Sequence, residues 1–321
     1  METKQEYWGS LAAGYFFLAA LGAMMFVIAA VLDLAGVALA GQINGWVSLV
    51  ALIVTGIGAL LLTVELGDKT KFYLVMTKPS SIMSLGAMMM SAFMVIALVY
   101  TTTFFSFVPW YPAYGLREVL AVLGIIAAVG LVAYPGLELG EARGRAFWNG
   151  SGLVPLFLVN GASSGIAGVI LMSVILGEAQ SPAILKLNGG IWFGFIVAQV
   201  ILLTGYLLGI KNTGVEEARR AVAGILQGDL RVKFWWGVVV AGALMPLIMY
   251  LFGNSPALLA AKAILVLIGC ACFRCVFLQA AVRRSLPGEE SEWMSAQEEA
   301  KLGLQLEKRW KEKEAWLYGG K

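Results

Sequence analysis

Glu65 and Tyr134 are the residues of this chain best suited to proton chemistry. Each ends a long apolar segment, Glu65 in LLTVELGDKTKFY and Tyr134 in LVAYPGLELGEARGRAFWN. A carboxylate accepts a proton and a phenol donates a hydrogen bond. Pro135 removes a backbone donor and frees a carbonyl one turn earlier, which opens a polar notch among apolar walls. Such a site would suit a quinone headgroup, whose carbonyls need hydrogen-bond donors and a proton partner.

Further polar residues accompany these two and are expected to support the same site. They are Tyr15, Lys71, Glu138, Arg143 and Arg145. Taken singly, the residues of this predicted site, Glu65 and Tyr134 included, have simpler interpretations. Glu65 could form an ion pair with Lys69 or Lys71, and an interfacial tyrosine beside headgroup-binding arginines is common in membrane proteins.

Histidine is absent from the sequence, which removes the usual axial ligand of b-type haem and the usual proton shuttle and metal ligand. Cys270, Cys272 and Cys275 form a C-x-C-x-x-C pattern. A straight helix points these side chains in different directions, and no fourth ligand accompanies them, so we interpret them as packing residues. We therefore expect no haem and no metal in this protein. No phosphate-binding loop, HExxH motif or nucleophile elbow occurs.

Four other charged residues lie within or beside apolar segments, where each costs about 2.5–3.5 kcal/mol on insertion scales. Asp33, Glu118, Lys262 and Arg274 are candidates for a proton path. Asp33 and Glu118 could equally be solvated residues at headgroup level. Arg274 is too deep to reach the interface easily and should find a carboxylate or backbone carbonyls inside the protein.

The elements that position these residues are transmembrane helices. Of 321 residues, 60% are hydrophobic and 13% charged, and the mean hydropathy is +0.81. Eight apolar runs are long enough to cross a hydrocarbon core of about 30 Å. They lie near 9–32, 45–67, 84–108, 116–139, 153–176, 188–209, 234–253 and 257–282. The expected fold is an all-α integral membrane protein.

We expect the eight helices to form two four-helix bundles, 1–152 with the quinone site and 153–282, followed by a charged, helical C-terminal tail at 283–321. FFLAALGAMM in the first helix and LFLVNGASSG in the fifth suggest two related halves. The alternative is that small residues favour helix packing anywhere. Residues 215–227 form an amphipathic pattern expected to lie on the membrane or on a partner.

The basic residues divide unevenly between the two faces. Nineteen of the 23 Lys and Arg residues fall on the side that carries both termini. The positive-inside rule then places both termini in the cytoplasm of a prokaryotic cell, with the protein in its inner membrane. The net charge of +3 follows this topology and does not indicate nucleic-acid binding. Tryptophans in the tail favour docking to a soluble subunit over a free solvated helix.

Several motifs, in order along nearly the whole chain, resemble the NrfD/PsrC family. These are the membrane subunits of polysulfide-reductase-type and related iron–sulfur molybdoenzyme complexes. The matching stretches are YFFLAALGA (15–23), ELGDKTKFYLVMTKPSSIMSLGAMM (65–89), YPGLELGEARGRAFWN (134–149), LVPLFLVNGASSGIAG (153–168) and FRCVFLQA (273–280).

The resemblance implies eight helices, a quinone site in the first bundle, no haem and an iron–sulfur subunit docked over that site. It assigns quinone binding and proton handling to Glu65 and Tyr134, and matches Arg274 to the family's last-helix arginine. Two features depart from the family pattern. The histidine that some members place near the quinone is missing, and the motif-bearing face carries positive charge, so its partner should be cytoplasmic.

The leading hypothesis is a quinone-reactive membrane anchor of an oxidoreductase complex, without a substrate-catalytic site of its own. Menaquinone or ubiquinone would exchange electrons with an iron–sulfur subunit and, through it, with a catalytic subunit of the molybdopterin type. The alternatives are a secondary transporter that binds a small anion at Arg274, or a proton-conducting membrane protein.

Overall fold

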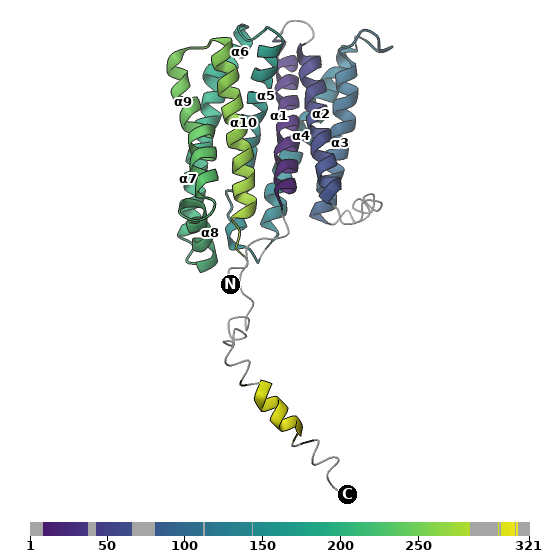
Figure 1. The fold of residues 1–321 in the computed structure, drawn as a ribbon. Helices are drawn as coiled ribbons and strands as arrows, with labels where there is room; N and C mark the ends of the chain where they lie inside the picture. The colour runs from purple at the N-terminus through teal and green to yellow at the C-terminus, as the bar shows by residue number, and fades with distance from the viewer. Residues whose placement is uncertain are drawn as a thin grey trace. The chain divides into compact units, whose positions relative to one another are not determined.

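The computed structural model describes residues 9–37, 43–65, 81–111, 113–142, 144–282, 301, 303–311 and 313, apart from the side chains of residues 10 and 65. Within these residues eight helical segments are long and apolar enough to cross a membrane, which confirms the predicted all-α membrane fold. They stand side by side as a helical bundle (Figure 1).

Six of the eight described spans are single α-helices. They are α1 (Ser10–Leu34), α2 (Ile43–Glu65), α3 (Ile82–Thr102), α4 (Tyr114–Gly140), α5 (Leu153–Ile175) and α10 (Pro256–Gln279). The other two are composite. One joins α6 (Pro182–Lys186), η3 (Leu187–Trp192) and α7 (Phe193–Lys211), and the other joins η4 (Lys233–Leu244), α9 (Met245–Met249) and η5 (Tyr250–Phe252).

Local chemistry explains several helix ends. Pro182 and Pro256 stand at the first positions of α6 and α10, where a missing N–H costs no hydrogen bond. The third span is shorter than the predicted 84–108 and ends at Thr102. There the hydroxyls of Thr102 and Thr103 donate to the carbonyls of Val99 and Tyr100, at 2.6 and 2.7 Å. These bonds stabilise a turn in place of further helix.

The two composite spans contain π-helical segments, which the sequence did not predict. Residues 187–192 form η3 and residues 233–244 form η4. Within η3, Asn188 is followed by Gly189 and Gly190, whose backbone dihedral angles are the least restricted and so depart most easily from those of a regular α-helix. π-Helical turns widen a helix and often accompany functional groups. Here η3 carries the buried side chains of Asn188 and Trp192.

α1 is the central helix of the domain. Its side chains are largely buried, and it packs against α2, α4, α5 and α10. Glycines of α5 allow a close approach between the two halves of the sequence. A Cβ atom on Gly165 would lie 2.6 Å from the backbone carbon of Met24 in α1, and one on Gly168 would meet the side chain of Met25. Small residues bring helix backbones together in membranes, as here.

Within each half of the sequence the helices pack against one another. In the first half α1 contacts α2 and α4, and α3 contacts both α2 and α4. In the second half α10 contacts α5 and η4, and α7 contacts the same two elements. Residues 1–283 nevertheless form one compact unit, so the predicted division at residue 152 stays a prediction. The tail, residues 284–321, is a separate unit in which residues 303–311 are helical.

The amphipathic helix α8 (Glu216–Leu226) forms where the sequence predicted it. Its apolar face, which includes Ala218, Val222 and Ile225, is buried against α7, η4 and the short turn η2 (Ala146–Trp148). The expectation that this face lies on the membrane or on a partner is therefore wrong. It covers the end of its own bundle, and Arg219 and Arg220 remain exposed.

The close contact between α5 and α1 can be tested with two glycine variants. Gly165→Ala should lower the unfolding free energy by about 1–3 kcal/mol, because the added methyl group meets the backbone of Met24. The measurement is the melting temperature of the purified protein in detergent. The matched control is Gly205→Ala in α7, where a Cβ atom meets nothing within 4 Å. Equal melting temperatures for the two variants would contradict this packing.

Candidate functional site

Tyr134 lies inside α4, directly before Pro135, and its side chain is 4% exposed. Pro135 has no N–H to donate to the carbonyl of Leu131, as the sequence indicated. The ring of Tyr134 occupies the space that a side chain at Gly86 of α3 would fill, and a Cβ atom there would lie 2.6 Å from its Cε1. Gly86 therefore lets a phenol from α4 reach the face of α3.

Glu138 lies one helical turn after Tyr134, and the two side chains share a hydrogen bond in which the phenol donates to the carboxylate. Tyr15 of α1 is 3% exposed and interacts electrostatically with both residues. Two phenols and one carboxylate from α1 and α4 thus converge at one end of the first four helices. We call Tyr15, Tyr134 and Glu138 the phenol–carboxylate cluster.

The structure records no ion pair for Glu138 among the described side chains; its recorded partners are the two phenols. A half-buried carboxylate beside phenols differs chemically from one beside an arginine. The described residues beside Glu138 are phenols rather than cations, and a carboxylate in such a setting is able to accept a proton. The cluster offers hydroxyl donors and a proton acceptor in a largely apolar site, which are the groups predicted for a quinone headgroup.

Three of the predicted site residues cannot be placed. Lys71 and Arg143 lie outside the described residues, and Glu65 ends α2 with a side chain that is not described. The role predicted for each stays a prediction.

Arg145 contacts the end of the last helix. Its Nη1 donates to the carbonyl oxygen of Ala281 at 2.8 Å, and its guanidinium stacks over Trp148, with 5.2 Å between Cζ and the ring centroid. Trp148 in turn donates to the carbonyl of Phe277 in α10, at 2.8 Å. A cation at a helix C-terminus is electrostatically favourable, so these contacts fix the turn after α4 to the end of α10.

Asp33 and Glu118 lie toward the opposite ends of α1 and α4 from the phenol–carboxylate cluster. Asp33 pairs with Arg117 at 3.2 Å and accepts a hydrogen bond from the hydroxyl of Tyr100, also at 3.2 Å. Glu118 is exposed. Asp33 therefore has both an ionic and a hydrogen-bonding partner, and the Arg117 pair links α1 to α4.

Lys262 of α10 is fully buried and lies in a polar network that the sequence did not predict. Its Nζ donates to Asn188 Oδ1 at 3.0 Å and lies 3.5 Å from the centre of the Tyr250 ring. Asn188 also donates to Asn254 Oδ1 at 2.9 Å, and its carbonyl accepts from the Tyr250 hydroxyl at 2.8 Å. The network ends at Gln180, which donates to the carbonyl of Asn254.

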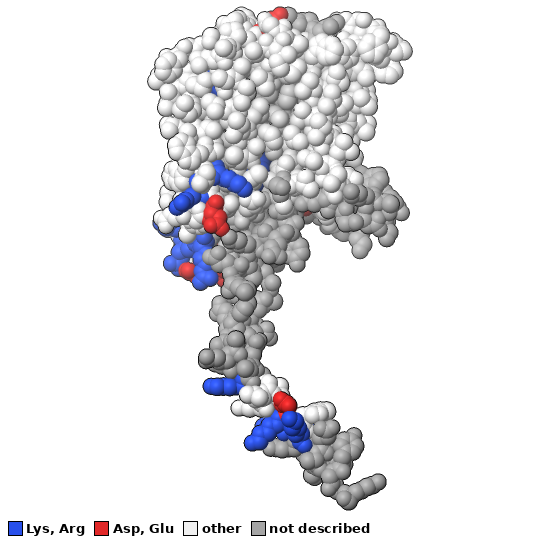
Figure 2. Space-filling model, in the orientation of Figure 1, with Lys and Arg blue, Asp and Glu red and all other residues white. Residues whose placement is uncertain are grey.

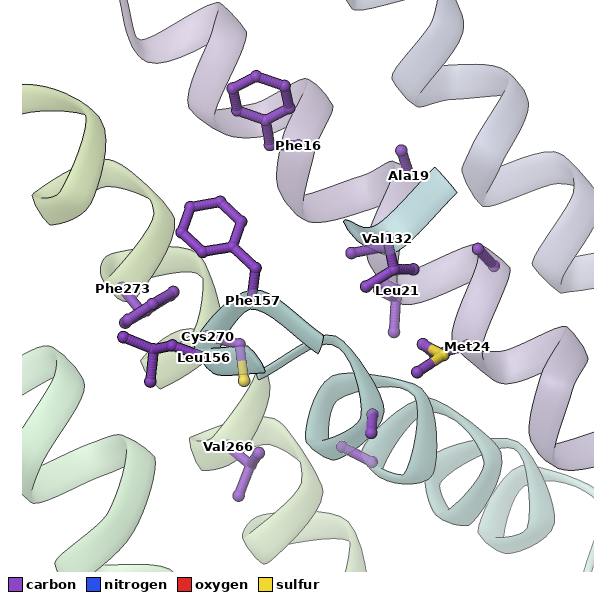
Figure 3. Close-up of a cluster of buried hydrophobic side chains, with 14 of the residues drawn as sticks. Phe16, Ala19, Leu21, Met24, Val132, Leu156, Phe157, Val266, Cys270 and Phe273 are labelled. Atoms are coloured by element: carbon purple, nitrogen blue, oxygen red, sulfur yellow. The ribbon is translucent and has the colours of Figure 1, made fainter. Parts of the chain in front are cut away.

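Arg274, also in α10, is 0% exposed. Its Nη2 donates to the carbonyl of Phe157 at 3.1 Å, and its guanidinium lies 4.1 Å from the centre of the Phe157 ring. Figure 3 shows Phe157 with Phe16, Cys270 and Phe273 in the apolar cluster where α1, α5 and α10 meet. The prediction that Arg274 faces the interior and bonds a backbone carbonyl is confirmed.

The described residues contain no group of three or more His, Cys, Asp or Glu that could hold a metal ion. Cys270 is buried against α5, with Sγ 3.6 Å from the carbonyl of Asn160, and Cys272 packs against Gly237 of η4. Cys270 and Cys272 thus pack against different helices, as expected for a regular helix.

Exposed basic residues gather at one end of the helical bundle, around α8 (Figure 2). They are Lys211, Arg219, Arg220, Arg231 and Lys233. The opposite ends of the described helices carry Arg117 and Lys186. We call the first group the basic rim.

The model of the family "Polysulphide reductase, NrfD" matches residues 1–284. This protein belongs to the NrfD family. The match covers the whole membrane domain and confirms the resemblance found in the motifs. NrfD membership and the eight apolar helices together make this a multi-pass membrane protein.

Three curated relatives of this NrfD-family protein have names in keeping with that family. The C chain of polysulfide reductase from Wolinella succinogenes is 27% identical over 217 residues, covering 63% of this sequence and 68% of the relative. Protein NrfD of Escherichia coli is 26% identical over 230 residues, covering 64% and 72%. The protein NrfD homolog of Haemophilus influenzae is 30% identical over 199 residues, covering 55% and 60%.

Proposed function

We propose that this NrfD-family protein is the quinone-reactive membrane subunit of a multi-subunit iron–sulfur oxidoreductase. Menaquinone or ubiquinone binds at the phenol–carboxylate cluster and exchanges two electrons and two protons there. The electrons pass between the quinone and an iron–sulfur subunit, and from that subunit to or from a catalytic subunit of the molybdopterin type. The observation that carries the proposal is the hydrogen-bonded pair of Tyr134 and Glu138 beside Tyr15.

The chemistry of these residues fits a quinone headgroup. A quinone carbonyl needs a donor, and the hydroxyls of Tyr15 and Tyr134 are donors. A quinol hydroxyl needs an acceptor, and the carboxylate of Glu138 is one. Tyr134 can turn its hydrogen bond from Glu138 to a bound carbonyl, which leaves the carboxylate able to accept a proton. Glu65 is proposed as a second proton acceptor at the end of α2.

Charge supports a cytoplasmic position for the partner subunits. The basic rim lies at one end of the bundle, and positive residues concentrate on the cytoplasmic side of bacterial membrane proteins (Figure 2). Both termini then lie in the cytoplasm. In the tail, Leu304, Leu306 and Trp310 are 67%, 58% and 66% exposed, so apolar side chains are available for docking to a soluble subunit.

The quinone site can be tested at its hydroxyl and its carboxylates. Tyr134→Phe, Glu138→Gln and Glu65→Gln should each lower quinone turnover by about 10²-fold or more, because a proton-transferring group is lost. The measurement is quinol oxidation or quinone reduction by the purified complex. Subunit content, checked on the same preparations, should be unchanged.

Tyr100→Phe is the matched control for Tyr134→Phe. Tyr100 is also a buried phenol bonded to a carboxylate, Asp33, but it lies at the opposite end of the first four helices. It should retain normal turnover. Normal turnover in Tyr134→Phe and Glu138→Gln, or equal losses in Tyr100→Phe, would refute the site.

The partner assignment can be tested by purification from the native membrane. The full-length protein should co-purify with iron–sulfur polypeptides and extractable quinone. A form truncated after residue 283 should retain the quinone and lose most of the iron–sulfur partner, because the tail forms a separate unit with exposed apolar residues. Recovery of the full-length protein alone, with neither partner nor quinone, would favour a transporter instead.

Proton conduction through the second half is a second candidate function, and the Lys262 network favours it. A buried lysine bonded to Asn188, which in turn bonds Asn254, provides exchangeable protons between the outer end of the bundle and its interior. Moving one charge across about 100 mV corresponds to about 2.3 kcal/mol, so coupling to redox chemistry would conserve energy.

Lys262→Met tests this candidate. In proteoliposomes, the variant complex should retain quinone turnover and lose proton movement across the membrane. Lys186→Met is the control, because Lys186 is an exposed lysine near the same end of the bundle. Unchanged proton movement in Lys262→Met would rule out a path through this residue.

A further inference from the structure

The guanidinium of Arg274 is a buried charge without a counter-charge among the described residues. Its side chain is 0% exposed, and its recorded hydrogen bond uses Nη2 and the carbonyl of Phe157. No carboxylate in the described part of the chain lies within ion-pair distance of it. Nε and Nη1 are buried and have no hydrogen-bond partner. A carbonyl and an aromatic face supply partial negative charge, which does not neutralise a full positive charge in a low-dielectric interior.

A second unsatisfied donor lies beside the first. Asn160 of α5 is 1% exposed, and its Nδ2 is buried without a partner. The Asn160 side chain meets the sulfur of Cys270, a weak acceptor one turn before Arg274 in α10, and Cys270 also interacts electrostatically with Arg274. Asn160 also lies one turn after Phe157, which bonds Arg274. Two neighbouring side chains from facing helices therefore present hydrogen-bond donors that meet no described side-chain acceptor stronger than a thiol sulfur.

Cys270 does not supply the missing negative charge. Its sulfur lies 3.6 Å from the carbonyl oxygen of Asn160, a contact in which the thiol donates. A thiol that donates a hydrogen bond carries its proton and is uncharged. Water would satisfy the free donors and leave the charge of the guanidinium uncompensated. An anion satisfies both requirements.

We propose that Arg274 and Asn160 bind a small inorganic monovalent anion of the halide type in the second half of the bundle. The ligand accepts hydrogen bonds and donates none, in keeping with the unused groups Nε, Nη1 and Nδ2. A halide has no fixed acceptor geometry, so it can take N–H groups from two helices at once. The ion joins α5 to α10 by bonding to both.

Aromatic side chains close the inner end of this site. Phe277 packs on Phe273 with ring centroids 4.3 Å apart, and on Phe147 at 5.4 Å. The hydroxyl of Tyr206 donates to the carbonyl of Phe147, and Trp148 is anchored on Phe277. This layer separates the guanidinium from the basic rim. The anion is therefore a resident structural ligand rather than a transported substrate.

The first experiment measures the melting temperature of the full-length protein, in its purified complex, in sodium chloride and in sodium gluconate at equal ionic strength. Gluconate is too large for a site closed by packed side chains. Chloride should raise the melting temperature by about 2–4 °C, with a saturable dependence on concentration, because a ligand that binds only the folded state stabilises it. Equal melting temperatures in the two salts would overturn the proposal.

Two variants separate this site from general salt effects. Asn160→Asp places a carboxylate beside Arg274, so it should abolish the chloride dependence and keep the higher melting temperature in gluconate. Arg117→Gln is the control, because Arg117 already pairs with Asp33, and it should retain the chloride dependence. Chloride dependence that persists in Asn160→Asp would contradict the assignment to these residues.

Bromide gives a direct and independent observation. Crystals of the complex prepared in bromide should show an anomalous peak within hydrogen-bond distance of Arg274 Nε or Nη1 and of Asn160 Nδ2. This experiment needs no substitution, so it does not depend on whether a variant folds. Density without an anomalous signal at that position would identify a water molecule and overturn the proposal. Neither readout involves quinone, so failure here leaves the proposed redox function standing.

Discussion

A charge or an unpaired hydrogen-bonding group inside a bilayer is costly, and this constraint explains how the polar side chains of the spans are arranged. Asp33 is met by a cation and a phenol, Arg117 and Tyr100, whereas the buried Lys262 is met by the neutral amide of Asn188. Glu138 is met by phenols and no recorded cation in the described part of the chain. Where partners are complete, the residues hold helices together. Where partners are incomplete, hydrogen-bonding or charged groups remain that can bind a ligand.

α1 contributes side chains to both places where such groups remain. It contributes Tyr15 to the phenol–carboxylate cluster on the side of α4, and Phe16 to the apolar cluster shared with Phe157 and Phe273 of α5 and α10 (Figure 3). Its backbone is held against α5 by Gly165. Consecutive residues of one tightly packed helix, Tyr15 and Phe16, therefore contribute to the proposed quinone site in the first half and to the apolar cluster beside Arg274 in the second.

Much of the fold could be predicted from the sequence, because span length and hydropathy are local properties. Tyr134 and Glu138 could both be assigned to one site because they lie one helical turn apart beside Pro135, although the sequence alone indicated only a supporting role for Glu138. Contacts between helices could not be predicted in this way. Asn188 and Lys262 are 74 residues apart. Because the spans are apolar on every face, the sequence does not indicate which sides of two helices meet. It does not indicate the π-helical turn at η3 either. The burial of α8 on its own bundle was missed because an apolar stripe does not specify its partner.

The most direct test of the proposed function is a density map of the intact complex with a tightly binding quinone analogue. The headgroup should lie between Tyr15 and Tyr134, with one oxygen within hydrogen-bond distance of a phenol and Glu138 next to the other proton position. An analogue bound elsewhere, for example beside Lys262, with the space between Tyr15 and Tyr134 filled by side chains, would contradict the account.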